Sequence, residues 1–466
     1  MLFNSIEYLL FLPIVFAIYW LLQKNLRLQN AFVVLASYVF YGWWDWRFLI
    51  LIAFTSLCSW GSGILIAESG KRKVKSGKLW LWLNIAINLG ILAIFKYYDF
   101  FVSEFGALFE ISTESLLLRI ILPVGISFYT FQALSYSIDV YRGNIKPTKD
   151  IIAFFAFISF FPQLVAGPIE RATNLLPQFL QNRKFSYEQG VDGMRQILWG
   201  LFKKIVIADN CATYVDQVWS TFGTQSGSTL LLAAVLFTFQ IYGDFSGYSD
   251  IAIGTAKLFG IRLMRNFYNP YFSRDIAEFW RRWHISLTTW FRDYVYIPLG
   301  GSRNGQWRTI ANTFVVFLLC AIWHGANWTY MVWGVYHVLL FIPLILMNCT
   351  HRYKSGEWKV ERGKNLMRIV LTFLLVTIGW IIFRAPTVAD AWGYVSTMCT
   401  TGWSIPAGLD YTIWIAIAMI GVMLGIEWRK EHGVARAQNV WFYYVLIGLI
   451  WWFAGHHTTD FIYFQF

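Results

Sequence analysis

Apolar blocks of about 15 to 22 residues follow one another along nearly the whole chain, and they constrain its fold more than any other feature. At ~1.5 Å rise per residue, such a block forms a helix that crosses most or all of a ~30 Å hydrocarbon layer. The blocks fall at 6–22, 31–46, 48–67, 79–98, 119–140, 151–168, 229–243, 310–324, 328–348, 366–383, 411–427 and 440–454, with weaker candidates at 191–209 and 249–260. The sequence therefore predicts an all-α polytopic membrane protein with about 11 or more transmembrane helices, some further segments being re-entrant or interfacial.

The composition agrees with a lipid environment. Hydrophobic residues make up 57% of the chain and charged residues 14%, whereas ordinary soluble domains carry roughly 25% charged residues. The first block follows Glu7 and has neither a basic leader nor a small-residue cleavage pattern, so we expect a retained helix rather than a secretory signal. The five cysteines show no paired spacing, which argues against a disulfide framework or a zinc site.

Positive charge indicates how the chain is oriented in the membrane. Cytoplasmic loops collect Lys and Arg, so the basic segment 71–78 is predicted to be cytoplasmic and the N terminus extracytoplasmic. The formal net charge of +12 then reflects topology, and nucleic-acid binding is not expected.

The segment 262–308 breaks the apolar pattern. Eight arginines (262, 265, 274, 281, 282, 292, 303 and 308) stand there against three acidic residues, with Trp and Phe interspersed. This pattern predicts amphipathic helices at the cytoplasmic interface, with guanidinium groups toward water or phosphate. By their spacing, Arg281, His284 and Thr288 would share one helical face.

His324 lies at the end of a short apolar segment. Residues 310–323 span only ~21 Å as a helix, which predicts that His324 lies within the membrane. A titratable ring at that depth is costly and favours a functional role. The structural alternative is a buried neutral imidazole bonded to backbone or Asn. For His337, on an otherwise apolar helix, that structural alternative is favoured.

Other polar groups stand between or after apolar blocks. Asp244 and Asp250 flank Tyr248 in the segment 240–250, and their carboxylates must face a polar cavity or pair with nearby arginines. A helix-breaking structural lock and a substrate contact are both compatible with this pattern. His456, His457 and Asp460 fit a solvated tail better than a metal site, and we expect no metal.

These residue types suit acyl transfer from a thioester to a hydroxyl. Such a reaction needs a general base with a pKa near the working pH, and donors for the developing oxyanion, for which a second His, Asn327 or backbone N–H groups would serve. Arginines suit the phosphates of CoA or of a carrier's phosphopantetheine. The chain has no phosphate-binding loop, dinucleotide fingerprint or Gly-x-Ser-x-Gly motif. The candidate residues are His324 and His284 as catalytic groups, and Asn327, Arg281, Arg282, Asp244, Tyr248 and Trp323 as substrate contacts.

Four runs of sequence carry a family resemblance: 160–171, 244–250, 280–287 and 323–328. They resemble the membrane-bound O-acyltransferase family, in particular its bacterial branch that acetylates alginate and peptidoglycan. The D-alanine transferases of teichoic acids are more distant. The resemblance covers nearly the whole chain, including the closing residues 461–466.

The resemblance implies one membrane-embedded domain over residues 1–466, with a motif-bearing core at 119–348 and peripheral helices at 1–118 and 366–466. It implies a ring of helices around a funnel-shaped centre, with His324 as the catalytic histidine and His284 at the family's second motif position. The expected reaction moves an acetyl group from acetyl-CoA or an acyl carrier, with no bound cofactor, through a bacterial inner membrane for polysaccharide O-acetylation. The resemblance further implies an extracytoplasmic partner of the Ser-Gly-Asn-His hydrolase type. Direct transfer and a covalent acyl relay both stay open.

Two other classes compete with an enzyme. A secondary transporter or acyl-donor channel would move the donor intact, but no internal repeat is evident and the polar positions crowd into 240–340. A scaffold for envelope assembly would tolerate loss of both histidines.

Overall fold

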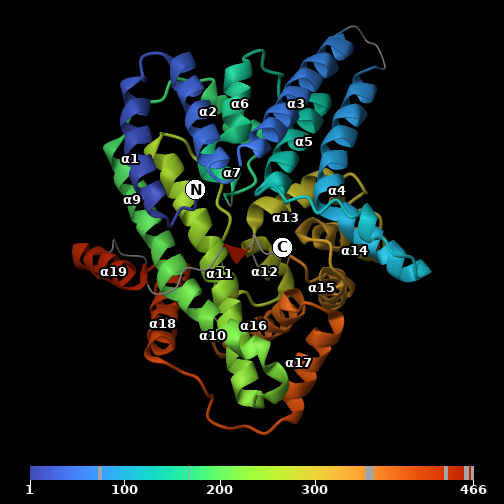
Figure 1. The fold of residues 1–466 in the computed structure, drawn as a ribbon, viewed down its shortest axis with the longest axis vertical. Helices are drawn as coiled ribbons and strands as arrows, with labels where there is room; N and C mark the ends of the chain where they lie inside the picture. The colour runs from blue at the N-terminus through green and yellow to red at the C-terminus, as the bar shows by residue number, and fades with distance from the viewer. Residues whose placement is uncertain (72–75, 166, 352–361, 435–438, 456–460, 463–466) are drawn as a thin grey trace. The chain divides into compact units, whose positions relative to one another are not determined.

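The computed structural model describes residues 1–71, 76–165, 167–351, 362–434, 439–455 and 461–462, and this part of the chain contains helices and no strand (Figure 1). It divides into two compact units. Unit 1 comprises Met1–Ile197 and Ser249–Met264, and unit 2 comprises Leu198–Tyr248 and Arg265–Phe466. The single domain expected over residues 1–466 stays a prediction.

Unit 1 is built from helices, some of which begin at polar capping residues. Its elements are α1 (Ile6–Leu21), α2 (Leu26–Gly42), α3 (Arg47–Lys71), α4 (Ser76–Phe109), α5 (Ile126–Arg142), α6 (Ile151–Ser159), α7 (Phe161–Leu164), α8 (Ala172–Phe179) and most of α9 (Tyr187–Leu201). Ser5, Asn25 and Asp150 accept hydrogen bonds from the first-turn N–H groups of α1, α2 and α6. Each cap satisfies donors that have no partner within the helix, which fixes where the helix starts.

Unit 2 carries the arginine-rich segment and both candidate histidines. Its elements are a π-helical turn (Phe202–Ala208), α10 (Asp209–Ser220), most of α11 (Gly227–Leu258), α12 (Ile276–Arg282), α13 (Ile285–Phe291), a second π-helical turn (Arg292–Tyr296), α14 (Gln306–His324), α15 (Trp328–Leu346), α16 (Arg362–Arg384), α17 (Val388–Thr400), α18 (Tyr411–Glu431) and α19 (Val440–Phe453). The short connection between α14 and α15 makes these two helices neighbours along their length.

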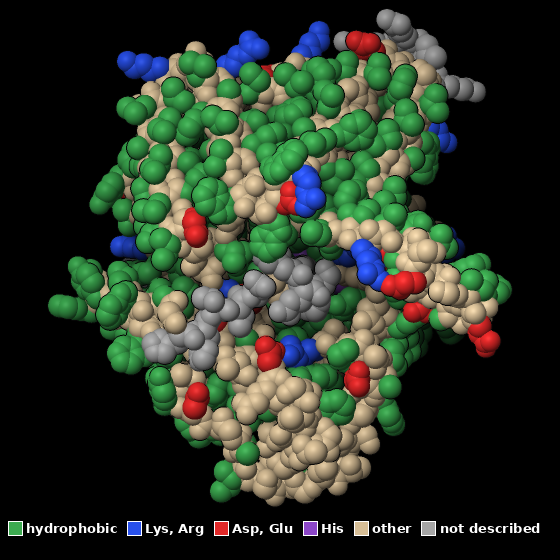
Figure 2. Space-filling view, viewed as in Figure 1, with side chains coloured by type: hydrophobic (Ala, Val, Ile, Leu, Met, Phe, Trp, Pro, Cys, Tyr) green, Lys and Arg blue, Asp and Glu red, His purple; other side chains and the backbone are tan. Residues whose placement is uncertain are grey.

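Within the described ranges, seven helices are long and apolar enough to cross a membrane: α3, α4, α11, α14, α15, α16 and α18. The apolar helices α1 and α19 are shorter. Along α1, Leu9, Ile14 and Leu21 are at least 60% exposed, as expected for side chains that face lipid, and Figure 2 shows many hydrophobic side chains on the visible face. The prediction of an all-α polytopic membrane protein is confirmed. The exact number of crossings and the ring around a funnel stay predictions.

Helix α11 differs from expectation because it runs unbroken where the sequence indicated two segments, 229–243 and 249–260. A Cβ added at Gly243 would lie 3.0 Å from the carbonyl oxygen of Lys203, and one added at Gly247 would lie 2.8 Å from that of Gly200. These glycines therefore serve close approach between helical backbones rather than a helix break.

Helix α14 is longer than the apolar segment 310–323 indicated. It begins at Gln306 and has 19 residues, so its length is ~28 Å, close to that of a full crossing. The argument that His324 lies within the membrane because its helix is short is therefore wrong. The surroundings of His324, described next, are what set it apart.

Candidate active site

Two histidines of unit 2 share one aromatic neighbour. His324 is the last residue of α14 and is 6% exposed, and His284 lies between α12 and α13 and is 1% exposed. The ring of Trp323 has its centroid 5.8 Å from that of His284 and 4.9 Å from that of His324. The structure thus brings together three of the residues that the sequence singled out.

His284 stands at a break in the helical path. Helix α12 ends at Arg282, Trp283 is extended, and His284 adopts left-handed backbone angles of φ 43° and ψ 52°. This conformation is uncommon for a residue with a Cβ. The expectation that Arg281, His284 and Thr288 share one helical face is therefore wrong, because no single helix contains them.

Asn266 fixes the orientation and tautomer of the His284 ring. Its side-chain oxygen Oδ1 lies 3.0 Å from His284 Nδ1, and the same oxygen accepts the Ser286 hydroxyl at 2.9 Å and the Ser286 N–H at 3.3 Å. A backbone N–H can only donate, so the Asn266 atom facing it is the acceptor oxygen. Nδ1 of His284 must then donate its hydrogen, and in the neutral ring the lone pair is on Nε2.

Burial keeps that ring uncharged. The pKa of His284 is lowered to about 3 because the imidazole is removed from solvent. Phe245 packs edge-on against the ring with centroids 4.6 Å apart, and Phe267 lies 6.4 Å away. At neutral pH His284 is a hydrogen-bond acceptor at Nε2 and carries no positive charge.

His324 is enclosed by aromatic rings. Its centroid lies 5.1 Å from Phe383, 5.4 Å from Trp333 and 6.4 Å from Tyr330. The next residue, Gly325, lets Tyr330 approach, since a Cβ there would lie 2.5 Å from the Tyr330 ring. This enclosure excludes water from most of the imidazole and strengthens electrostatic interactions within the site.

Asn327 uses both of its side-chain polar atoms in the fold. Its oxygen accepts the Thr329 N–H at 3.0 Å as the N-cap of α15, and its nitrogen donates to the Pro386 carbonyl at 3.0 Å. The predicted oxyanion contact would have to compete with these bonds.

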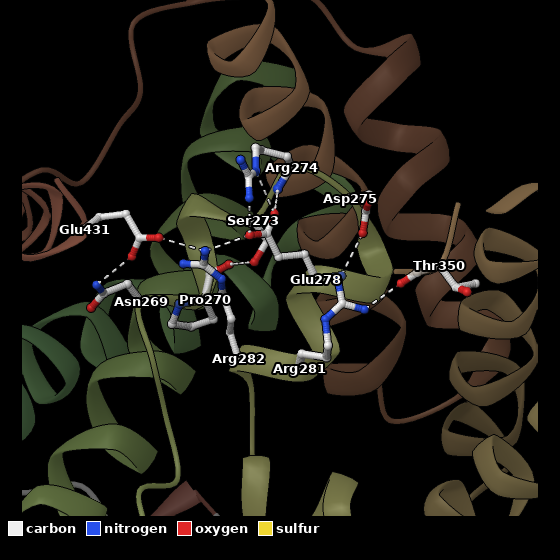
Figure 3. A network of polar contacts seen from close by, with 10 residues as sticks. All are labelled: Asn269, Pro270, Ser273, Arg274, Asp275, Glu278, Arg281, Arg282, Thr350 and Glu431. Carbon is white, nitrogen blue, oxygen red and sulfur yellow. Dashed lines mark hydrogen bonds and ion pairs between the residues drawn. The ribbon is translucent and has the colours of Figure 1, made fainter. Parts of the chain in front are cut away.

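Arg282 belongs to a buried ion-pair network (Figure 3). Its guanidinium lies between Glu278 and Glu431, 2.7 Å from a carboxylate oxygen of each, and Arg274 pairs with the same Glu278 at 2.9 Å. Asn269 donates to Glu431 at 3.1 Å. The expectation that these guanidinium groups face water or phosphate is wrong for Arg274 and Arg282, because buried carboxylates neutralise both.

Arg281 has different surroundings from its neighbour. It is half-buried, donates to the Thr350 carbonyl at 2.6 Å and lies beside Asp275 (Figure 3). Burial lowers its pKa and Asp275 raises it. Arg281 is thus more exposed than Arg282, which is fully buried between two carboxylates, and it stays a predicted contact of an anionic substrate.

Asp244 pairs with a lysine rather than an arginine. Its Oδ1 lies 2.9 Å from Nζ of Lys204, which also contacts Asp209 at 2.8 Å, and all three side chains are buried. Tyr248 lies one turn further along α11, with its ring 5.6 Å from the Lys204 ammonium. Sequence reasoning missed Lys204 and Asp209. The signal was present, because Lys203 and Lys204 interrupt the apolar candidate 191–209.

Of the remaining histidines, His351 is exposed, and the others have structural contacts or lie outside the described residues. His337 accepts a hydrogen bond from the Trp280 indole at 3.3 Å, as its structural interpretation predicts. His432 bonds to the Trp428 carbonyl at 2.8 Å. His456, His457 and Asp460 lie outside the described residues.

Comparison with known proteins places this geometry in a family context. Residues 145–383 match the membrane-bound O-acyltransferase family. The chain is 41% identical over 409 residues to a probable alginate O-acetylase of Pseudomonas aeruginosa, covering 86% of this chain and 75% of the relative. It is 34% identical to a peptidoglycan O-acetyltransferase of Helicobacter pylori, over 84% of this chain and 78% of that protein. A teichoic acid D-alanyltransferase of Bacillus subtilis is 28% identical, over 56% of this chain and 68% of the relative. The family range contains His284, His324, Asp244 and the arginine-rich segment.

Proposed function

Since the chain belongs to the membrane-bound O-acyltransferase family, we propose that this multi-pass membrane O-acyltransferase moves an acetyl group from a cytoplasmic thioester to an extracytoplasmic hydroxyl. Acetyl-CoA or an acyl carrier protein would supply the thioester. The observation that supports the site is the contact of Trp323 with both His284 and His324. Two imidazoles beside one ring, buried among aromatic side chains, offer acid–base groups where water is scarce.

His324 is the proposed general base. The acceptor oxygen attacks the thioester carbonyl carbon while the imidazole takes the hydroxyl proton, and the proton then passes to the departing thiolate sulfur. The products are an ester and a free thiol, so atoms and charge balance. The position of His324 at the end of α14, next to Gly325, places the ring where the chain leaves the helix. A covalent relay through His324 would divide the same transfer into two steps.

His284 has a narrower range of roles than the sequence allowed. With Nδ1–H committed to Asn266, neutral His284 has only the Nε2 lone pair to offer. It therefore serves as an acceptor that orients the incoming hydroxyl or an N–H group. It does not donate a hydrogen bond to the oxyanion. Donors for the oxyanion would come from backbone N–H groups near the break after His324.

The relatives support the proposed class of acceptor, and the family resemblance supports the proposed partner. The alginate and peptidoglycan transferases make a cell-envelope or exopolysaccharide hydroxyl the favoured final acceptor. An extracytoplasmic enzyme of the Ser-Gly-Asn-His hydrolase type would receive the acetyl group and deliver it. The Lys/Arg pattern supports an N terminus on the outside, and the bacterial relatives support a bacterial inner membrane.

The test is acetyl transfer by the purified protein supplied with labelled acetyl-CoA, the extracytoplasmic partner enzyme and a soluble glycan acceptor, with free CoA measured in parallel. His324→Ala should lower kcat by about 10²- to 10⁴-fold, the usual contribution of a general base. His337→Gln is the matched control, because its amide can still accept the Trp280 N–H, and it should keep activity near that of the unsubstituted protein. His324→Ala with full turnover would overturn the proposal.

The same labelled donor, supplied to protein reconstituted in vesicles, separates an enzyme from a transporter. Transfer releases one CoA for each acetyl group delivered, whereas a channel would carry labelled acetyl-CoA across a vesicle membrane intact. Transport of intact donor without release of CoA would favour the transporter.

A further inference from the structure

Two residues near the C-terminal end of the chain pack into the interior of unit 2. Phe461 is fully buried and Ile462 is 3% exposed. Their contacts are with α11, on the side of that helix that carries Phe245 and Tyr248. Neither residue takes part in the transfer chemistry described above.

The first contact is polar. The backbone N–H of Ile462 donates to Oδ2 of Asp244 at 2.6 Å, while Oδ1 of the same carboxylate faces Lys204. Asp244 is buried, so an acceptor oxygen left without this donor would lose its hydration and gain nothing in return. The Lys204–Asp244 pair is thus completed by a backbone group from a distant part of the sequence.

The second contact is aromatic and leads to the site. The Phe461 ring has its centroid 4.2 Å from that of Tyr248 and 6.0 Å from that of Phe245. Phe245 in turn packs edge-on against His284 at 4.6 Å. One aromatic side chain therefore separates Phe461 from an imidazole of the site.

We propose that Phe461 and Ile462 form a positioning segment of the transfer site, anchored on Asp244, whose Phe461 ring holds Phe245 against His284. The inference rests on the proposed role of His284. The two residues do not touch the reacting atoms. They act by limiting the movement of Phe245 and the access of water to the imidazole.

The activity test compares two buried phenylalanines. Phe461→Ala should lower kcat on the order of 10-fold, with KM for acetyl-CoA changed by less than about twofold, because displacement of a positioned group acts on the chemical step. Phe453→Ala, which empties a buried position on α19, is the control for general loss of packing and should leave kcat unchanged. Phe461→Leu should recover most of the loss. Equal kcat values for the two alanine variants would overturn the inference.

The anchoring bond has its own pair of variants. Ile462→Pro removes the N–H that Asp244 accepts, whereas Ile462→Val keeps it. The proline variant should reproduce the kcat loss of Phe461→Ala, and the valine variant should behave like the unsubstituted protein. A fully active proline variant would contradict the anchor.

A chemical readout decides the positioning role independently of transfer. Diethyl pyrocarbonate modifies unprotonated imidazoles, and peptide mass spectrometry locates the modification at His284. Phe461→Ala should increase the rate of modification at His284 several-fold, and Phe453→Ala should not. If neither variant changes that rate, the inference fails even where acetyl transfer is observed. If the rate rises but no acetyl transfer occurs, the proposed function fails alone.

Discussion

His284 donates its Nδ1 hydrogen to the side-chain oxygen of Asn266 across 3.0 Å. The bond joins a left-handed residue to a residue 18 positions earlier in the chain, and it decides which ring nitrogen holds the lone pair. A general feature of acid–base sites is that a second group orients the imidazole. In this protein the orienting group is a neutral amide.

Removing the Asn266 amide should impair catalysis although the His284 imidazole stays in the site. Asn266→Ala takes away the acceptor, so the His284 ring is free to change tautomer, and kcat should fall on the order of 10- to 100-fold. Ser286→Ala is the control, since it removes a different donor to the same oxygen and leaves the His284–Asn266 bond. Steady-state kinetics of acetyl transfer measures both. An Asn266→Ala protein with unchanged kcat would show that the tautomer is held by other means.

The buried ion pair between Arg282 and Glu431 should matter for stability. Glu431→Ala leaves a buried guanidinium with one carboxylate fewer, and breaking such a pair costs about 3–5 kcal/mol. Thermal unfolding in detergent micelles should show a clear decrease in Tm. Glu104→Ala, an exposed position on α4, serves as the control and should change Tm little.

The pair can also be replaced as a unit. Arg282→Met combined with Glu431→Leu removes both charges, so the double variant should be less destabilised than the sum of the single variants. Additive losses would indicate that the two side chains act independently.

Glu170 should make stability depend on pH. Burial raises the pKa of its carboxyl group to about 7, against hydrogen bonds from Met264 and Asn174 that favour the charged form. The folded protein therefore holds this proton more tightly than the unfolded chain does. The resulting stabilisation is full below about pH 4.5 and is lost as the pH rises through 7, at roughly 1.4 kcal/mol per pKa unit of difference.

The measurement compares the unsubstituted protein with Glu170→Gln between pH 5 and pH 8. Other groups titrate equally in both proteins, and burial of His284 acts with the opposite sign because it lowers a pKa. As the pH rises, the Tm of the unsubstituted protein should therefore fall relative to the Tm of Glu170→Gln. A difference that does not vary with pH would contradict the assignment to Glu170.

Two glycine variants, one on α11 and one on α18, test whether Gly247 is needed for close packing of α11. A Cβ at Gly247 would lie 2.8 Å from the Gly200 carbonyl oxygen, so Gly247→Ala should destabilise the protein by about 1–3 kcal/mol. At Gly421 on α18 nothing lies within 4 Å of the added Cβ, and Gly421→Ala should be neutral or slightly stabilising. Thermal unfolding of the two variants, prepared alike, measures the contrast. Equal Tm values would mean that close packing does not explain Gly247.

Hydropathy was sufficient to predict the membrane fold, whereas the roles of the two histidines stay predictions. His324 and His284 stand out because an imidazole is unexpected among tryptophans and aliphatic side chains, and the all-helical membrane fold follows from the apolar blocks. The partners of those residues were harder to predict. Asn266 lies in an arginine-rich run with no periodicity that marks it, and its role depends on a left-handed turn 18 residues later.

Charge pairing also exceeded what the sequence could predict. The arginine-rich segment indicated an interfacial face, yet Arg274 and Arg282 are neutralised by Glu278, in the same segment, and by Glu431, about 150 residues away. Lys204 and Asp244 likewise come from different helices. Such pairs depend on which helices become neighbours, and local spacing does not contain that information. The helix break considered for the segment 240–250 does not occur, and the sequence could not show this, because glycines that allow a close approach and glycines that break a helix look alike there.

The backbone at His284 limits which other residue types that position can accept. Left-handed angles are costly for residues branched at Cβ and least costly for glycine and asparagine. Asparagine would keep that turn at little strain and could still offer an amide hydrogen toward Asn266, but it has no titratable nitrogen. Natural divergence at this position should therefore pass most easily between an imidazole and a carboxamide, and each such exchange would preserve the turn while changing the basicity of the side chain next to Trp323.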